Sequence, residues 1–179
     1  MTSRQGDPDP EPDPEGVART IALRRLAGAP QTRAQLDDAM RRRGVADDVR
    51  GTVLDRFGEV GLIDDAVFAE AWVESRLAGH GLAKRALAFE LRRRGVEPAV
   101  VDDAVSALVP EREEATAKAL VAARLAGTRG LEPAARTRRL VGMLGRKGYP
   151  PGLAFRVVRD ALTADGVGEE QMPDQPADD

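Results

Sequence analysis

The sequence predicts an all-α protein made of three tandem three-helix repeats that form an elongated, curved, solenoid-like body. Three observations lead to this class. Apolar residues recur at intervals of three and four, the period of a helix with one buried face. The word R-L-A-G occurs at residues 25–28, 76–79 and 124–127, roughly 50 residues apart. The alternating patterns and β-branched runs typical of strands are missing.

A second repeated word marks the ends of the predicted second helices. R-R-R-G-V occupies residues 41–45 and 92–96, and residues 146–149 hold a degraded copy, R-K-G-Y. The apolar positions between the words match across the copies: Leu36, Leu87 and Leu140; Met40, Leu91 and Leu144; Val53, Ala104 and Val157. The third copy has extra residues around 128–133, which accounts for its changed spacing. We expect the stacked units to complete one another's cores, because each alone buries little apolar surface.

The predicted organisation has five parts. They are an acidic disordered tail at 1–16, three-helix repeats at 17–62, 63–109 and 110–163, and a second acidic disordered tail at 164–179. The first tail alternates acidic residues with proline, which blocks helix and sheet. It carries five acidic residues and one basic, whereas the second carries six acidic residues and none basic. Since the net charge of the whole chain is only -3, the body between the tails is basic.

The first repeat supplies clear helix boundaries. The spacing predicts a helix that opens at Val17 and ends at Gly28. Thr32 and Gln35 have the pattern of a capping box at the start of the next helix. The third helix is expected to begin at Asp47 and to end in glycines.

The second and third repeats follow the same plan. Their third helices are expected to begin at Pro98 and Pro151, because the first helical position needs no N–H donor. Asp64 is the expected N-cap of the first helix in the second repeat. A glycine turn at 79–81 ends that helix, and Gly95 ends the next. The inward face of the helix after Asp64 is expected to comprise Val67, Phe68, Ala71, Trp72, Ser75 and Leu77.

Composition narrows the class of protein. The chain has no cysteine, so it has neither a disulfide framework nor a thiolate metal site. No apolar run approaches the roughly 20 residues that span a membrane, and the N-terminus has no apolar signal segment. We expect a cytoplasmic monomer that does not contact a membrane.

The sequence favours a protein that is not an enzyme and has no cofactor and no metal. Its only histidine, His80, lies in the glycine turn, and no pattern suggests an orienting partner or a nucleophile for it. No G-x-x-x-x-G-K-S/T loop is present to hold a nucleotide. We interpret Asp64 and Asp65 as helix-capping residues, since no further oxygen ligands cluster near them in the sequence.

The arginine triplets at 41–43 and 92–94 are the candidate partner-binding feature. Cations at a helix C-terminus contribute about 0.3–1 kcal/mol each, and one or two would serve that purpose. Three in a row fan over about 200° of the helix surface. Arginine stems also cover apolar surface, so capping, packing and partner binding all stay open, with binding favoured. The expected binding surface comprises Arg41, Arg42, Arg43, Arg76, Lys84, Arg85, Arg92, Arg93, Arg94, Arg138, Arg139, Arg146 and Lys147.

A row of basic helix ends along the body suits nucleic-acid phosphates or an acidic protein surface. Base stacking is disfavoured, because aromatic residues are 3% of the chain and Trp72, Phe57, Phe68 and Phe89 take apolar-face positions. Tyr149 is the ring expected to be exposed. Duplex binding by a helix-turn-helix module is a rival, although the predicted third helices open with few base-reading residues.

The stretch G-L-I-D-D-A-V-F-A at residues 61–69 resembles the RecX family, which carries G-Y-L-D-D-x-x-F-A there. The similarity continues through the turn at 79–81 to the R-K-G-Y element at 146–149, and it covers residues 17–163. Family members often read G-Y-G-P in the central turn. This chain has G-H-G-L, so His80 replaces an aromatic residue.

The resemblance implies a regulator of the RecA recombinase that is not an enzyme. Such proteins bind RecA, typically along the groove of its filament on single-stranded DNA. They modulate, and mostly inhibit, its ATPase, strand-exchange and coprotease activities in recombination, DNA repair and the SOS response. Direct contact with DNA is compatible with this role, and a direct DNA-binding helical-repeat protein is the alternative.

Overall fold

The computed structural model describes residues 13–168 and residue 170. Within these residues all regular secondary structure is helical, which confirms the all-α class. A one-turn 3-10 helix, Ala126–Thr128, follows the seventh α-helix. The α-helices are α1 (Pro14–Gly28), α2 (Arg33–Arg41), α3 (Asp47–Glu59), α4 (Asp65–His80), α5 (Lys84–Arg93), α6 (Pro98–Ser106), α7 (Pro110–Leu125), α8 (Pro133–Arg146) and α9 (Pro151–Ala164).

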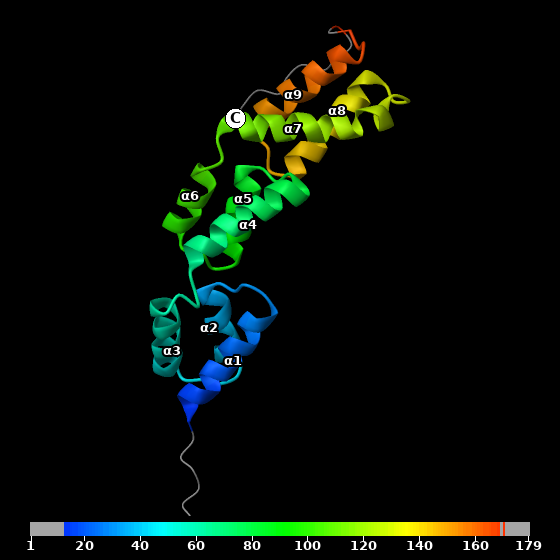
Figure 1. Cartoon of the computed structure of the whole chain (residues 1–179). Coiled ribbons are helices and arrows are strands. Elements are labelled where there is room, and N and C mark those ends of the chain that lie inside the picture. The colour runs from blue at the N-terminus through cyan, green and yellow to red at the C-terminus, as the bar shows by residue number, and fades with distance from the viewer. Residues whose placement is uncertain (1–12, 169, 171–179) are drawn as a thin grey trace, which may run out of the picture. The chain divides into compact units, whose positions relative to one another are not determined.

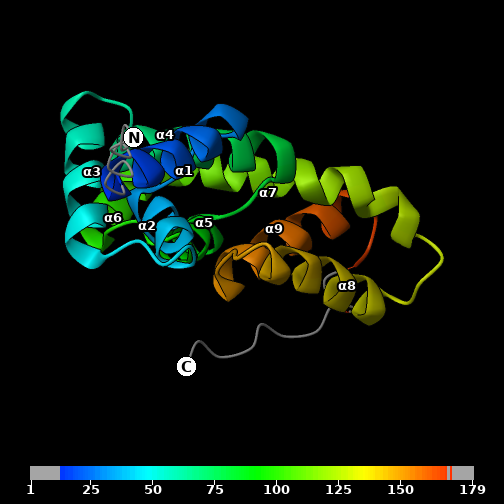
Figure 2. The same ribbon diagram turned by 90° about the horizontal axis from the view of Figure 1, so that it is seen from below.

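The chain divides into two compact units, Met1–Asp64 and Asp65–Asp179. In the first unit α1, α2 and α3 pack around one apolar core (Figure 1). In the second unit α4, α5 and α6 share one core, and α7, α8 and α9 share another. Figure 2 shows α9 lying beside α7 and α8. The division into three repeats and the elongated, curved body stay predictions.

The apolar positions matched by sequence all lie inside these cores. Leu36, Leu87 and Leu140 are at most 1% exposed, although they come from three different helix groups. The other six are also buried: Met40, Leu91, Leu144, Val53, Ala104 and Val157. A helix with one buried face repeats its inward positions every three or four residues, and alignment of the repeated words located the equivalent positions in each copy.

A glycine with left-handed backbone ends the second helix of each group. The φ angles of Gly44, Gly95 and Gly148 are 78°, 78° and 90°. In each case the backbone N–H of the residue after the glycine donates to the carbonyl five residues earlier, at an N–O distance of 3.2 Å. The donor and acceptor residues are Val45 and Met40, Val96 and Leu91, and Tyr149 and Leu144. The degraded third word therefore builds the same helix end as the two R-R-R-G-V words.

The first helix begins earlier than the sequence predicts. It starts at Pro14 rather than Val17, because the Asp13 carboxylate accepts the Gly16 N–H at 2.7 Å and proline suits the first helical position. The predicted tail boundary at residue 16 is therefore wrong, and the remainder of that tail, residues 1–12, lies outside the described residues. The capping box of Thr32 and Gln35 at the start of α2 is confirmed.

The predicted inward face of α4 is partly wrong. Val67 is 61% exposed, and Ala71 and Ser75 are exposed as well. The face packed into the core runs instead through Phe68, Ala69, Val73 and Leu77. The predicted start of the second repeat at residue 63 also shifts, because Ile63 packs in the first core and the second unit begins at Asp65.

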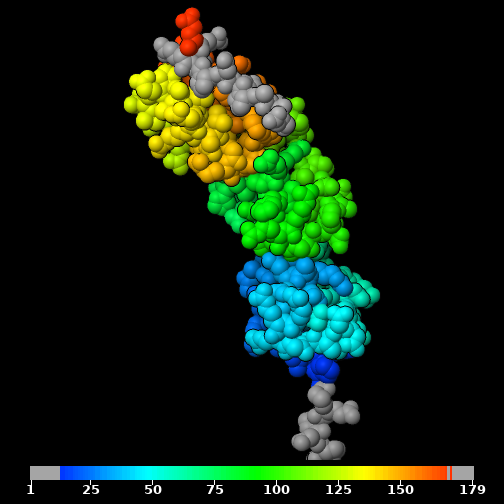
Figure 3. Space-filling model, turned by 180° about the vertical axis from the view of Figure 1, so that it is seen from behind, coloured from blue at the N-terminus to red at the C-terminus, as the bar shows by residue number. Residues whose placement is uncertain are grey.

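Two of the extra residues of the third group, Thr128 and Arg129, take part in an ion-paired corner with Arg136 and Asp165. Arg136 is 5% exposed and donates to Thr128 Oγ1 at 3.0 Å and to Asp165 Oδ2 at 2.5 Å. The guanidinium of Arg129 pairs with the other oxygen of Asp165 at 2.7 Å. Hydrogen bonds from Arg129 and Arg136 lower the pKa of Asp165 to about 2. In the space-filling view α8 (yellow) and α9 (orange) meet side by side (Figure 3).

This corner corrects the predicted C-terminal tail. Ala164 still belongs to α9, Asp165 is held by two arginines, and Val167 is buried in the third core. The helix ends at Ala164, and Gly166, two residues later, has a left-handed φ angle of 89°. The fold therefore extends to about Val167 rather than to residue 163, and the predicted disorder at 169 and 171–179 concerns positions outside the described residues.

Candidate interaction surface

The basic words occupy the last turns of α2, α5 and α8 and the residues that follow them. Cations there face the negative end of the helix dipole, so the local fold favours them whatever they bind. The glycine and the apolar residue after each word turn the chain back into the core. The side chains of Arg41, Arg42, Arg92, Arg93 and Arg146 remain exposed.

At the end of α2 one carboxylate serves two arginines. Arg41 and Arg42 pair with Asp38 at 2.5 and 2.6 Å. The hydrogen bond from Arg41 is the largest cause of the lowered pKa of Asp38. Arg43 is exposed and has no ion pair with any described residue. Because surface ion pairs contribute little to stability, a partner's anion can replace Asp38 at small cost.

At the end of α5 the three arginines have three different neighbours. Arg92 pairs with Asp102 at 3.1 Å, and both side chains are more than half exposed. The guanidinium of Arg93 lies 5.8 Å from the ring centre of Phe89, and that of Arg94 lies 3.6 Å from the ring centre of Trp72. Of the three, Arg92 and Arg93 are therefore exposed to a partner, whereas Arg94 is partly buried.

Trp72 organises the face between α4 and α5. Arg76 lies over the same ring at 4.2 Å, and Phe68 stacks beside it with ring centres 5.8 Å apart. Glu90 accepts the indole N–H at 2.9 Å and pairs with Arg76 at 3.2 Å. Burial, followed by the charge of Arg76, lowers the pKa of Arg94. Arg76 and Arg94 thus stack on an indole. The sequence left packing open as a role of the arginine triplets, but it did not identify this ring as the partner.

The exposure of two aromatic residues is the opposite of the prediction. Phe89 is 60% exposed, whereas Tyr149, expected to be exposed, is only 2% exposed. The Tyr149 hydroxyl donates to the Gly81 carbonyl at 3.0 Å, and burial raises its pKa to about 12. Tyr149 follows the left-handed Gly148 and therefore takes the inward place of Val45 and Val96. Phe89 is exposed because the inward face of α5 runs through residues 87, 88 and 91.

The structure brings two predicted basic segments together. The Lys147 carbonyl accepts the Ala83 N–H at 2.9 Å, and the Lys147 ammonium donates to the His80 carbonyl. The start of α5, with Lys84 and Arg85, therefore lies beside the end of α8, which carries Arg146. His80 itself is exposed, as expected.

The start of α5 has an unexpected cap. Ala83 gives no side-chain cap, and the Lys84 N–H instead donates to the carboxylate of Glu113 at 2.9 Å. Glu113 comes from α7 and is only 9% exposed. A carboxylate at a helix N-terminus interacts favourably with the helix dipole, and this offsets the unfavourable placement of Lys84 and Arg85 there. Nothing in the sequence pattern marked Glu113, because its partner is 29 residues away.

The remaining predicted residues lie apart from these clusters. Arg138 and Arg139 are exposed on α8, and neither forms an ion pair with another described residue. The predicted row of basic ends spans residues 41–147 and so belongs to both compact units. Its continuity stays a prediction.

The described residues contain no group of three or more His, Cys, Asp and Glu side chains that could hold a metal ion. None of the helices in the described part of the chain is long and apolar enough to cross a bilayer. The arrangement offers guanidinium and ammonium groups on helix ends, which suits carboxylate or phosphate recognition.

Comparison with known proteins identifies the family. The family models for the first and second three-helix domains of RecX match residues 18–57 and 64–105. The chain is 59% identical over 167 residues to regulatory protein RecX of Thermobifida fusca (strain YX), covering 92% of this chain and 90% of that protein. It is 54% identical to regulatory protein RecX of Streptomyces lividans, covering 97% and 93%.

A solved structure shares the fold. The crystal structure of RecX from Lactobacillus salivarius matches with a TM-score of 0.77 at 15% sequence identity, covering 84% of this chain and 98% of that one. The helical architecture is therefore shared at low identity. Taken with the sequence matches to regulatory proteins over nearly its whole length, this shows that the chain belongs to the RecX family.

Proposed function

We propose that this protein binds RecA and its filament on single-stranded DNA, and that it mostly inhibits the ATPase, strand-exchange and coprotease activities of RecA. It acts as a binding protein in recombination, DNA repair and the SOS response, without catalysing a reaction. Membership of a family of regulatory proteins supports this role. We further propose that it works as a cytoplasmic monomer.

The observation that carries the proposal is the exposed basic end of α5. Arg92 and Arg93 are both exposed, and the guanidinium of Arg93 lies 5.8 Å from the centre of the exposed Phe89 ring. An exposed aromatic ring next to arginines has the composition of a protein-binding hot spot. Arg43, Arg85, Arg138, Arg139 and Arg146 supply further exposed cations. Several weak contacts with successive subunits of one polymer add through effective concentration.

The test is the RecA ATPase on single-stranded DNA, titrated with this protein. A variant with Arg92→Glu and Arg93→Glu should need about tenfold more protein for the same inhibition, since two charges at the contact change sign. Arg94 is left unchanged, because it packs on Trp72 and its loss would disturb the fold.

A matched control changes two exposed arginines of the same unit that lie outside the proposed surface. The variant with Arg124→Glu and Arg159→Glu carries the same net charge and should inhibit like the parent chain. Equal inhibition by both folded variants would refute the placement of the contact at α5. Failure of the parent chain to change RecA activity at all would refute the proposed function.

Direct DNA binding is the second candidate, and the exposure of Phe89 favours it. An accessible ring flanked by Arg93 can stack on a base of single-stranded DNA. This function predicts affinity for DNA without RecA, and log affinity should fall by about 0.7 per phosphate contact per log unit of salt on a single strand. A salt titration on single-stranded DNA alone separates the two candidates.

A further inference from the structure

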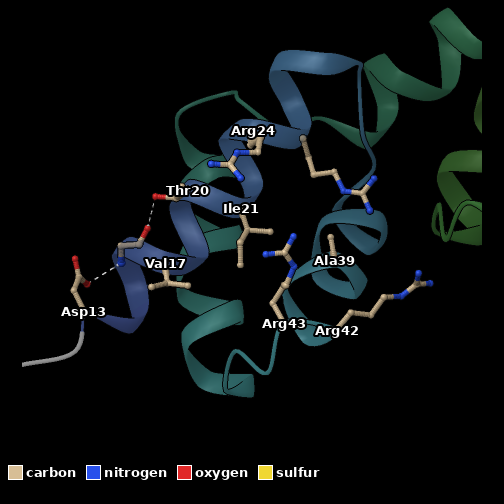
Figure 4. A pocket seen from close by; sticks show the side chains of 10 residues that line it. Asp13, Val17, Thr20, Ile21, Arg24, Ala39, Arg42 and Arg43 are labelled. Atoms are coloured by element: carbon tan, nitrogen blue, oxygen red, sulfur yellow. Dashed lines mark hydrogen bonds between the residues drawn. The ribbon is translucent and has the colours of Figure 1, made fainter.

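The first unit contains an open groove between α1 and α2, with a volume of about 870 Å³. Figure 4 shows Val17 and Ile21 on α1 facing Ala39 on α2 and Arg43 in the turn that follows α2. The apolar floor is incompletely covered, because Val17 is 55% exposed. Four arginines also line the groove: Arg24, Arg25, Arg42 and Arg43.

The positive charge at the groove is largely unmatched. Arg42 pairs with Asp38, whereas Arg24, Arg25 and Arg43 form no ion pair with the other described residues. The single acidic residue of the lining, Asp13, lies at one end, where its carboxylate caps α1 (Figure 4). An apolar floor with a cationic rim is complementary to an acidic segment that carries an apolar side chain.

The second helix group shows what fits such a groove. When the repeated words are aligned, Ile21 and Ala39 take the places of Trp72 and Glu90. Arg25 and Arg43 likewise take the places of Arg76 and Arg94. In the second group the two guanidinium groups lie over the indole, and Glu90 binds both the indole N–H and Arg76. The first group keeps the two arginines but supplies neither ring nor carboxylate.

The third group covers the corresponding position in another way. The aligned residues there are Leu120 and Lys147. Gly81 lies close to Leu120, since a Cβ on Gly81 would be only 3.0 Å from that side chain, and Lys147 donates to the His80 carbonyl. The turn after α4 therefore covers Leu120 and Lys147. The equivalent place is thus filled by a side chain in one group and by a neighbouring turn in the next.

From this internal comparison we infer that the α1–α2 groove binds a partner protein segment that presents an aromatic side chain beside a carboxylate. The ring lies on Ile21 between Arg25 and Arg43, and the carboxylate takes the place that Glu90 has in the second group. This inference rests on the proposed function, since it gives the chemistry of one segment of the regulated partner. Nucleic acid fits less well, because the aliphatic floor offers a base no aromatic stacking partner.

The test uses the full chain and a labelled synthetic peptide with one tryptophan flanked by glutamates, followed by fluorescence anisotropy. Control peptides replace tryptophan by alanine, or the glutamates by glutamines. Arg43→Glu should weaken binding of the first peptide by about tenfold or more, because it reverses a charge at the carboxylate site. The matched change Arg19→Glu, on the other side of α1, should leave it unchanged.

A second variant fills the groove with side chains of the protein itself. Ile21→Trp with Ala39→Glu recreates the pair that the second group carries, and it should abolish peptide binding while the chain stays folded by circular dichroism. If this variant does not fold, Val17→Glu serves instead, since that position is exposed and lies near the start of a helix, which favours acidic residues.

Equal peptide binding by Arg43→Glu and the parent, or equal binding of all three peptides, would overturn the inference. Binding of single-stranded DNA but not of the peptide would overturn it as well. So would peptide binding only by a chain that lacks residues 1–12, because the groove would then be assigned to the chain's own acidic segment. RecA ATPase is measured in parallel. Inhibition without peptide binding defeats only the groove inference, whereas peptide binding without inhibition defeats only the proposed function.

Discussion

The ends of α2 and α5 carry the same five-residue word and the same helix-ending backbone, yet their arginines have different neighbours. At α2, Arg41 and Arg42 share Asp38. At α5, Arg94 lies over Trp72 and Arg92 pairs with a residue of α6. The repeated residues build the turn, whereas residues outside the word decide which guanidinium groups are engaged.

The α4–α5 face of the second group is closed by a stacked ring, whereas the equivalent α1–α2 face of the first group is an open groove. Trp72 gives the second group a ring that holds two arginines, and the aligned Ile21 gives the first group a groove floor. Two changes, Ile21 for Trp72 and Ala39 for Glu90, therefore separate the available arginines of the first group from the packed ones of the second. The predictions below alter one side of this comparison at a time.

The largest effect is expected from Trp72→Ala. The change removes a half-buried ring in contact with Phe68, Arg76 and Arg94, and should lower the free energy of unfolding by about 3 kcal/mol. The aligned change Ile21→Ala should cost only about 1 kcal/mol, because part of that side chain faces the groove. Urea unfolding followed by far-UV circular dichroism measures both, since Trp72 is the only tryptophan.

Hydrogen exchange supplies the control for this pair. Trp72→Ala should speed exchange in α4 and α5 and leave α1 and α2 unchanged, because the two helix groups belong to separate units. Equal losses of stability from Trp72→Ala and Ile21→Ala would contradict the distinction between a closed and an open face.

Two carboxylates that each hold two arginines provide the next comparison. Asp165 and Asp38 are 10% and 33% exposed, and both have lowered pKa values. The pKa of Asp165 is about 2 in the folded chain against an ordinary value of 3.8, so its contribution to stability is complete above about pH 4 and is lost as the pH falls toward 2. Asp165→Asn should remove this acid dependence.

Asp38→Asn is the matched surface change and should have the smaller effect on stability, since its pairs are more exposed. The measurement is the urea midpoint of the parent and both variants at several pH values between 2 and 5. If the Asp165→Asn variant lost stability toward low pH as steeply as the parent, other carboxylates would cause the acid sensitivity.

Tyr149→Phe tests the contact between the second and third helix groups. Loss of the hydroxyl leaves the Gly81 carbonyl without that donor, and should cost about 1 kcal/mol. Because burial raises the pKa of Tyr149 to about 12, the folded chain loses stability as the pH rises above 10, the ordinary value. Tyr149 is the only tyrosine, so phenolate absorbance reports its titration directly. A midpoint near pH 10 in the folded chain would contradict its burial.

Much of the fold follows from local rules. The matched leucines, the capping box at Thr32, the prolines at the starts of α6 and α9 and the glycines at helix ends each depend on a few neighbouring residues. The C-terminal tail boundary did not follow, because Asp165 is ordered by arginines 29 and 36 residues away. A composition pattern cannot distinguish a solvated acidic residue from a paired one.

The candidate surface was predictable only as a set of charges. The words located Arg92 and Arg93 correctly on an exposed helix end, but the stacking of Arg76 and Arg94 depends on how α4 packs against α5. The aromatic assignments for Phe89 and Tyr149 were reversed, although one signal was present in the sequence. Alignment of the third word places Tyr149 at the buried position of Val45 and Val96.

The smallest effect on stability is expected from Phe89→Ala, within about 0.5 kcal/mol, because the ring is 60% exposed and alanine is a strong helix former. Leu23→Ala, at an exposed apolar position of α1, is the matched change in the first unit and should be equally mild. The two variants should differ in binding rather than in folding. If the α5 end contacts the partner, Phe89→Ala alone should weaken RecA inhibition or single-stranded DNA binding, whereas equal binding by both variants would leave the exposed ring without a role in recognition.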